Sequence, residues 1–549
     1  MAILDGILPA VTQVNHFSSG YVAQIQADGQ PEASNSEGIS MKQTSNAILK
    51  GGAILDGTGS PAFPGDVVIR DGRIVSVGER GSAPAAEGDY PTIDCTGHVV
   101  APGFIDVHSH SDLQVLENRT EKLLQGVTSE VVGNCGFSPY PLPDKPEVLR
   151  EFANGILCGN ETWGWNSASD YLASAGKSPV ANVASLVGHG SLRIKVAGNT
   201  SRELTSRELD TMAGLLDDAL EEGAAGLSSG LMYAPGSGAS AEELTALGRV
   251  VARRDKVYTT HMRNYSAGLV EAVEEQLAVA EGSGCRLQIS HLQAAGEDYW
   301  PLLQRAIEAI EKAVKRGVDV AFDAYPWLAG STVLTQVLPQ DALDGGIAKL
   351  LERLRDPEQR EAIRPRIKPE ARWTGVVITS TATNADALVG RPVQDIANER
   401  GTDPETTVMD ILLEQEGNVN IVEHCQSTEN LHALLTHPLG IVITDGVYTR
   451  GRSHPRLYAT FPLLLGEMVR ERKWLSLEEA VHKVTGKPAA RFHLKDRGRV
   501  AEGYAADITV FNPSTIHTDA TYEKPDVAPS GIRAVLRNGQ VALPSGVVV

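Results

Sequence analysis

Two histidines separated by one residue, His108 and His110, stand at the end of an apolar run that begins at Val99. Successive side chains of a strand point to opposite faces, so this spacing places both imidazoles on the same face. Apolar runs of this kind are typical of parallel sheets covered on both sides, where chemistry gathers at the carboxyl ends of the strands. The pair therefore predicts a metal site. The alternative is that they are two surface histidines at the end of a strand.

Further candidate ligands stand at the ends of later apolar segments. The second segment runs into Gly133-Asn134-Cys135-Gly136, the fifth ends at His261 and the sixth ends at His291. A cysteine alone is more often a small buried hydrophobe, but four histidines and a cysteine at equivalent strand ends favour metal binding. A thiolate among imidazoles selects zinc over magnesium or calcium, which prefer oxygen ligands. We therefore expect one or two zinc ions.

An aspartate, Asp445, ends the eighth apolar segment and is followed by Gly446. An aspartate before glycine usually forms a turn. Beside a metal centre, however, a carboxylate can take a proton from the attacking water and pass it to a leaving amine. The combination predicts hydrolytic chemistry.

The elements that must position these side chains are apolar strands that alternate with amphipathic helices. The eight candidate strands cover residues 99–107, 127–134, 180–188, 224–231, 256–260, 286–290, 319–324 and 441–444. Helical periodicity is clear at residues 207–222, 241–254, 267–281 and 302–315. This alternation predicts an α/β fold, with a (β/α)8 barrel of the TIM type favoured over an open sheet.

Short β segments at both ends of the chain predict a small β-sandwich domain built from residues 47–98 and 495–549. Asp71-Gly72 and Asn538-Gly539 are typical two-residue hairpin turns. The catalytic barrel would occupy residues 99–494, with a lid-like insertion at about 332–417 and extra strands at 375–379 and 418–422. Residues 1–46 show no durable apolar period, which predicts a disordered leader.

Composition narrows the classes of partner. The 549 residues include 49 basic and 69 acidic side chains, a net charge of −20, which argues against nucleic acid or an anionic membrane. Five cysteines without a CxxC pair suit a reducing compartment. The first 41 residues contain no lysine or arginine, so the start of a signal peptide is missing. We expect a cytoplasmic protein acting on a small molecule, while the oligomeric state is not readable.

Together these motifs resemble the amidohydrolase superfamily, metal-dependent hydrolases on a (β/α)8 barrel with a small β-sandwich. Within it, the chain resembles the N-acyl-D-amino-acid deacylases from about residue 47 to the C-terminus. The motifs that carry this resemblance are Gly133-Asn134-Cys135-Gly136, Asp323-Ala324-Tyr325-Pro326, Ala329-Gly330-Ser331-Thr332 and His454-Pro455-Arg456-Leu457-Tyr458.

The resemblance implies a role for each candidate residue. The tightly bound zinc would be held by Cys135, His261 and His291, with the cysteine replacing the carboxylated lysine of many superfamily members. A second, weaker metal position would be formed by His108, His110 and Asp445. Asp445 would also be the proton shuttle. The substrate carboxylate would be held by Tyr325 and Arg456, with Ser331 nearby.

One position departs from the family pattern. The deacylases usually have a lysine two residues after the sixth-strand histidine, where this chain has Gln293. Because glutamine carries no charge, binding of a carboxylate would depend more strongly on Arg456. The substrate could therefore differ from a standard N-acyl amino acid.

The leading hypothesis is zinc-dependent hydrolysis of N-acyl-D-amino acids to a carboxylate and a free amine, and the D preference comes from the resemblance alone. A second hypothesis is a cyclic-amide hydrolase of the hydantoinase or dihydroorotase type. Those enzymes use a carboxylated lysine at the fourth strand, and residues 223–230 contain none. A hydrolase of amides or lactams without a free carboxylate is a third hypothesis, and a non-catalytic assembly protein is a fourth. The assembly protein should have lost metal ligands, yet all six candidates are present.

Overall fold

The structure, a computed structural model, describes residues 45–79, 81, 90–159, 163–368, 371–383 and 387–544. Its centre is an eight-stranded parallel sheet with the order β17-β13-β12-β11-β10-β9-β8-β6. These strands are β6 (Phe104–Asp106), β8 (Val127–Val132), β9 (Asn182–Gly188), β10 (Gly226–Gly230), β11 (Val257–His261), β12 (Arg286–Ile289), β13 (Val320–Ala324) and β17 (Gly440–Val442). Each expected strand region therefore contributes one strand to this sheet.

The two ends of the sheet meet just beyond its outer strands. Short strands β7 (Ser109–His110) and β18 (Gly446–Val447) pair in parallel, and the Asp445 backbone N–H donates to the His108 carbonyl at 2.9 Å. Because the first and last strands are joined in this way, the sheet closes on itself. The predicted (β/α)8 barrel is confirmed.

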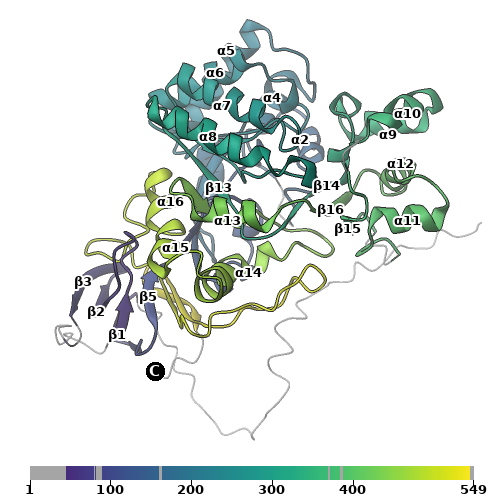
Figure 1. The fold of residues 1–549 in the computed structure, drawn as a ribbon. Coiled ribbons are helices and arrows are strands. Elements are labelled where there is room, and N and C mark those ends of the chain that lie inside the picture. The colour runs from purple at the N-terminus through teal and green to yellow at the C-terminus, as the bar shows by residue number, and fades with distance from the viewer. Residues whose placement is uncertain are drawn as a thin grey trace, which may run out of the picture. The chain divides into compact units, whose positions relative to one another are not determined.

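Helices lie between successive strands and cover the outside of the barrel (Figure 1). The four expected helices are α5 (Ser206–Glu221), α6 (Ala241–Arg253), α7 (Leu269–Ser283) and α8 (Leu302–Lys315). In α8 the residues at helical spacing, Leu303, Ala306, Ile307 and Ile310, are buried against the sheet. Other α-helices around the barrel are α2 (Pro146–Phe152), α3 (Ala168–Ala175), α4 (His189–Ala197), α13 (Thr428–Thr436), α14 (Arg456–Leu463), α15 (Leu477–Lys483) and α16 (Gly486–Arg491).

Segments from both ends of the chain form a second, mixed sheet with the order β21-β20-β19-β5-β1-β2-β3, with β4 paired to β1. Its strands are β1 (Ala47–Ile54), β2 (Phe63–Arg70), β3 (Arg73–Glu79), β4 (Thr92–Asp94), β5 (Val99–Pro102), β19 (Ile508–Phe511), β20 (Ile532–Arg537) and β21 (Gln540–Pro544). Asp71-Gly72 and Asn538-Gly539 connect two hairpins with positive φ at all four residues, as predicted. This sheet has a hydrophobic cluster of its own. Its treatment as a separate domain stays a prediction.

The expected first barrel strand, residues 99–107, divides between the two sheets. β5 pairs with β1 and β19 of the terminal sheet, and only β6 pairs with β8 of the barrel. The division falls at Gly103, where an added Cβ atom would lie 2.2 Å from Oγ1 of Thr128. A continuous apolar run shows that both halves are buried, but it does not show that they belong to different sheets.

Between β13 and β17 lies the insert, which we define as residues 329–424. Its strands β14 (Ala329–Val333), β16 (Val419–His424) and β15 (Val376–Thr381) form a three-stranded antiparallel sheet. Its helices are α9 (Ile347–Arg355), α10 (Pro357–Ile363), α11 (Val393–Arg400) and α12 (Pro404–Glu414), and it has its own hydrophobic cluster. The strands expected at 375–379 and 418–422 are confirmed, whereas β14 was not expected as a strand.

Three other expectations concern the chain as a whole. All five cysteines lie in the described part of the chain and are free thiols, as expected. In the described residues no helix has the length and apolarity needed to cross a membrane. Almost all of the expected leader, residues 1–44, lies outside the described residues.

Candidate active site

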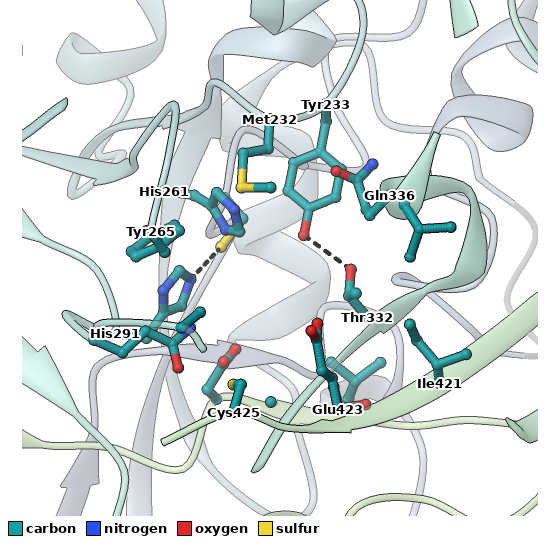
Figure 2. A pocket seen from close by; sticks show the side chains of 18 of the residues that line it. Met232, Tyr233, His261, Tyr265, His291, Thr332, Gln336, Ile421, Glu423 and Cys425 are labelled. Atoms are coloured by element: carbon teal, nitrogen blue, oxygen red, sulfur yellow. Dashed lines mark hydrogen bonds between the residues drawn. The ribbon is translucent and has the colours of Figure 1, made fainter. Parts of the chain in front are cut away.

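The six predicted ligand residues converge at the carboxyl end of the barrel. They form three overlapping groups, and the possible ligand atoms within each group all lie within 4.8 Å of one another. The groups are His108, His110 and Cys135; Cys135, His261 and His291; and His108, His291 and Asp445. Figure 2 shows His261 and His291 turned toward the same point in the pocket.

Cys135 and Asp445 are the two anionic side chains at the centre of this cluster. The Cys135 Sγ atom lies 3.2 Å from Nε2 of His108 and 3.5 Å from Nε2 of His291. The Asp445 Oδ1 atom lies 3.3 Å from Nε2 of His110 and 3.5 Å from Nε2 of His108. His108 is therefore placed between the thiol and the carboxylate, and the candidate ligands surround one small volume.

The backbone at the strand ends is held in an unusual conformation. Cys135, His291 and Asp445 have φ values of 54°, 34° and 49°, in the left-handed region that L-residues seldom adopt. Cys135 is preceded closely by Gly133, where a Cβ atom would lie 2.2 Å from the Leu186 carbonyl oxygen. Strain of this type gathers at functional sites because the surrounding structure must enforce it. All three of these residues are candidate metal ligands.

The charges of the cluster shift the pKa values of its members. Burial alone would raise the pKa of the Cys135 thiol, but the neighbouring histidines, His108 first, hold it well below its usual range. Burial would likewise raise the pKa of the Asp445 carboxyl, and Arg456 and His108 outweigh it and keep that pKa low. Both shifts favour the anionic form, which is the form that binds a metal ion.

These residues fit a zinc ion. His261 is half-buried, but both of its ring nitrogens are shielded from solvent and have no hydrogen-bond partner within the described part of the chain. Buried polar atoms without partners are uncommon in folded proteins, so this pair of nitrogens indicates a ligating role. A thiolate with two imidazoles is a donor set typical of zinc.

Asp323, which lies near the end of β13, supports the candidate ligands from behind. Its Oδ1 atom accepts the backbone N–H of His291 at 2.6 Å and lies 3.5 Å from Nδ1 of His108. Its Oδ2 atom accepts the side-chain amide of Gln288 at 2.9 Å. Contacts of this kind fix the ring orientation of a metal-ligating histidine. Asp323 was not among the site residues predicted from the sequence, although its place at the end of the seventh strand was the available signal.

A buried polar network joins the first and last strands below the cluster. Asp106 accepts the Thr444 backbone N–H at 3.0 Å, and Lys122 donates to both the Asp106 carboxylate and the Thr444 hydroxyl. Lys122 is also 3.7 Å from Glu130. The side chains of Asp106, Lys122 and Glu130 are at most 4 % exposed, so their charges must be compensated within the protein.

The four residues expected to contact substrate also lie together. The Arg456 guanidinium is 2.9 Å from Asp445 Oδ2 and stacks over the Tyr325 ring at 4.6 Å. It also donates to the Ser331 carbonyl at 3.4 Å, and the Tyr325 hydroxyl donates to Oε1 of Gln293 at 3.3 Å. Arg456 is fully buried. It therefore does not pair with an acidic surface neighbour, and its partner is the carboxylate of the cluster itself.

A pocket of about 310 Å³ opens above the cluster between the barrel and the insert. Its walls include Met232 and Tyr233 from the barrel, and Glu423 and Lys368 from the insert. None of these four was singled out from the sequence. The insert therefore forms part of the pocket wall and places charged side chains in it.

Comparison with known proteins agrees with this geometry. The amidohydrolase family matches residues 91–543. The N-acyl-D-glutamate deacylase of Alcaligenes xylosoxydans xylosoxydans is 34% identical over 92% of this chain and 95% of its own length. The D-aminoacylase of the same organism is 32% identical, with coverage of 90% and 94%. The N-acyl-D-glutamate deacylase from Bordetella bronchiseptica, solved with zinc and a phosphonate mimic of the tetrahedral intermediate, has a TM-score of 0.78 and 34% identity, covering 92% and 98%.

The barrel with its cluster of strand-end histidines thus defines an amidohydrolase, and the chain belongs to that family. Within the family it belongs with the N-acyl-D-amino-acid deacylases, because relatives of that group match almost all of its length. The resemblance inferred from the sequence is confirmed.

Proposed function

We propose that this chain hydrolyses N-acyl-D-amino acids to a carboxylate and a free amino acid. The observation that carries the proposal is the position of Asp445, which touches two histidines of the cluster on one side and Arg456 on the other. A proton-accepting group thus lies between a candidate metal site and a candidate carboxylate site. The D configuration is supported by the relatives, whose names specify it.

Zinc is the metal we assign to the cluster. The tight position would be held by Cys135, His261 and His291, whose possible ligand atoms form one group. A weaker position would be held by His108, His110 and Asp445, because Asp445 Oδ1 lies 3.5 and 3.3 Å from the two histidines. A bound zinc ion would polarise the amide carbonyl and favour ionisation of water near neutral pH.

Asp445 has the geometry of the proton shuttle. Its lowered pKa leaves the carboxylate free to accept a proton from the attacking water at Oδ1. The same oxygen would deliver that proton to the nitrogen of the leaving amine, so the carboxylate is regenerated in each cycle. Arg456, bound to Oδ2, keeps Oδ1 directed at the cluster.

The amino-acid end of the substrate would lie against Arg456 and Tyr325. A guanidinium can bind a carboxylate through two parallel hydrogen bonds, and the Tyr325 hydroxyl can add another. In this structure the single hydroxyl proton of Tyr325 is donated to Gln293, so it would have to turn from Gln293 to the substrate carboxylate. Ser331 also lines the pocket. Because Arg456 already pairs with Asp445, one guanidinium would serve both the shuttle and the substrate.

A second candidate is hydrolysis of amides or lactams that lack a carboxylate. Two observations favour it: Gln293 is uncharged, and Arg456 already has an anionic partner in Asp445. A cyclic-amide hydrolase of the hydantoinase type is disfavoured, because β10 contains no lysine and the cluster contains Cys135.

A hydrolysis screen with metal analysis tests the proposal. The substrates are N-acetyl-D-amino acids, their L forms, hydantoins and N-acyl amines. We expect turnover of the D compounds only, by protein that carries zinc. Turnover of hydantoins or N-acyl amines in their place would contradict the proposal, and would favour the hydrolase class that acts on the compound turned over.

The remaining expectations stay predictions. A cytoplasmic location is expected from the free cysteines. The expected partner is the small-molecule amide, with neither nucleic acid nor membrane.

A further inference from the structure

We propose that the ion pair Lys368–Glu423 faces the side chain of the bound amino acid and restricts the enzyme to uncharged side chains. This inference rests on the proposed function and adds the class of substrate. In this proposal the insert selects the side chain of the substrate, whereas residues of the barrel carry out the hydrolysis.

Glu423 projects into the pocket from β16. Alternate residues of this strand and its extension, Ile421, Glu423 and Cys425, all line the pocket, as the period of a strand requires. Figure 2 shows Glu423 rising from this strand toward Thr332, between Ile421 and Cys425. The carboxylate is thus part of the pocket wall, flanked by two less polar side chains.

This part of the wall adjoins the expected carboxylate site. Gly330 of β14 stands directly opposite Glu423 in the antiparallel register. A Cβ atom at Gly330 would lie only 3.6 Å from the Tyr325 hydroxyl. When the substrate carboxylate is bound by Tyr325 and Arg456, the side chain on the α-carbon of the substrate would lie beside β16. The side chain of the amino acid would therefore meet Glu423.

Lys368 neutralises that carboxylate. Its ammonium donates to both oxygens of Glu423, at 2.5 and 2.7 Å. The two side chains are 19 % and 21 % exposed, so solvent screens the pair only in part. At the same end of the pocket, Arg366 pairs with Asp341, and both of those side chains are at least half exposed.

Each charge of this wall thus has an opposite partner already. An acidic substrate side chain would be repelled by Glu423 unless Lys368 gave up its partner, and a basic one would be repelled by Lys368. Unpaired or like charges in a partly desolvated site reject a ligand more effectively than a missing contact does. A neutral side chain incurs neither cost.

A plainer interpretation is that the pair only braces the insert, because Lys368 also donates its backbone N–H to Val337. The two interpretations differ in how substrate selectivity responds to substitution. A brace would change activity toward all substrates alike. A selector would change the ratio of kcat/KM for charged and neutral substrates. For any one such ratio, substitution of Glu423 and substitution of Lys368 would act in opposite directions.

The experiment measures kcat/KM for two matched pairs of N-acetyl-D-amino acids: glutamate with glutamine, and lysine with norleucine. For the zinc-loaded wild-type enzyme we expect the neutral member of each pair to be preferred by roughly tenfold or more. Glu423→Gln should raise the glutamate-to-glutamine ratio about tenfold, because the carboxylate that repels an acidic side chain is removed. Lys368→Met should raise the lysine-to-norleucine ratio by a similar factor.

A matched control is the pair Arg400–Glu414, which also lies within the insert but does not line the pocket. Glu414→Gln should leave both ratios unchanged. Should Lys368→Met fail to fold, Lys368→Gln gives the same comparison with a more polar side chain.

Three outcomes would overturn the inference. Wild-type enzyme could prefer a charged side chain, neither substitution could change its ratio, or both substitutions could shift the same ratio, for example glutamate to glutamine, in the same direction. In each case hydrolysis of N-acetyl-D-amino acids would still uphold the proposed function. If the wild-type enzyme hydrolysed none of them, the proposed function itself would fail and the inference with it.

Discussion

Cys135 combines a strained backbone with the only sulfur among the six candidate ligands. Its position, within reach of both His261 and His291, makes it the residue on which tight zinc binding should depend. Cys135→Ala is expected to reduce the content from about one zinc per chain to a weakly bound remainder. Elemental analysis after dialysis measures this loss. Cys285→Ala is the matched control, because Cys285 is equally buried but belongs to none of the candidate metal groups. Full zinc and activity in Cys135→Ala would remove this cysteine from the site.

Asp445 is both the proposed proton shuttle and the partner of Arg456, and one substitution tests both roles in a folded protein. Asp445→Asn keeps the shape of the side chain but cannot accept the proton of the attacking water, so turnover should fall by roughly 10² to 10⁴. Arg456 would also lose a buried counter-charge, and we expect a lower thermal midpoint. Circular dichroism at the assay temperature confirms that the variant is folded. Near-normal turnover would exclude Asp445 as the shuttle.

Arg456 tests whether the site recognises a carboxylate. Arg456→Ala should lower kcat/KM toward N-acyl amino acids by on the order of 3 kcal/mol, roughly a hundredfold, relative to the matching N-acyl amines. The comparison between substrates is essential, because the same change removes the partner of Asp445 and slows both reactions. Gln293→Lys is the complementary variant, and it should improve capture of N-acyl amino acids. Equal losses on both substrate classes would favour hydrolysis of a neutral amide or lactam.

At the scale of elements, the barrel is held closed by the network below the candidate metal site. Lys122 joins Asp106 of the first barrel strand to Thr444, which follows the last. Lys122→Met would leave the Asp106 carboxylate buried without a cation, which typically costs about 3–5 kcal/mol. We expect a lower urea midpoint and weaker binding of the second metal. Lys349→Met, at an exposed ion pair of the insert, should change neither. An unchanged urea midpoint in Lys122→Met would show that the network does not hold the barrel closed.

The barrel could be predicted from the sequence because each strand is an apolar run and each helix has a clear period, as in α8. The convergence of His108, Cys135 and His261 followed from the same rule, since strand ends of a parallel barrel meet at one face. The sequence could not show that residues 99–102 leave the barrel, because burial is common to both sheets. It also could not bring Lys368 to Glu423, because a pairing across the insert depends on tertiary structure.

At the scale of the whole molecule, the candidate ligands join parts of the chain that are distant in sequence. His108 and Asp445 follow the first and last barrel strands, and Cys135, His261 and His291 stand at the ends of three strands between them. An ion in the tight position would therefore link three barrel strands, and one in the weaker position would join the first strand to the last. A ligand that binds the folded state alone stabilises it by an amount that grows with the logarithm of its concentration over its Kd.

Removal of the metal should therefore lower the thermal midpoint of the chain. At a free zinc concentration near a thousand times the Kd, the linkage contributes about 4 kcal/mol. We expect chelation to shift the midpoint by several degrees and added zinc to restore it. Calcium should not restore it, because thiolate and imidazole are poor ligands for that ion. Cys135→Ala should unfold near the midpoint of the chelated wild type and respond only weakly to zinc. A variant that gained as much stability from zinc as the wild type would show that the stabilising ion binds elsewhere, and that the strand-end cluster does not hold the barrel through a metal.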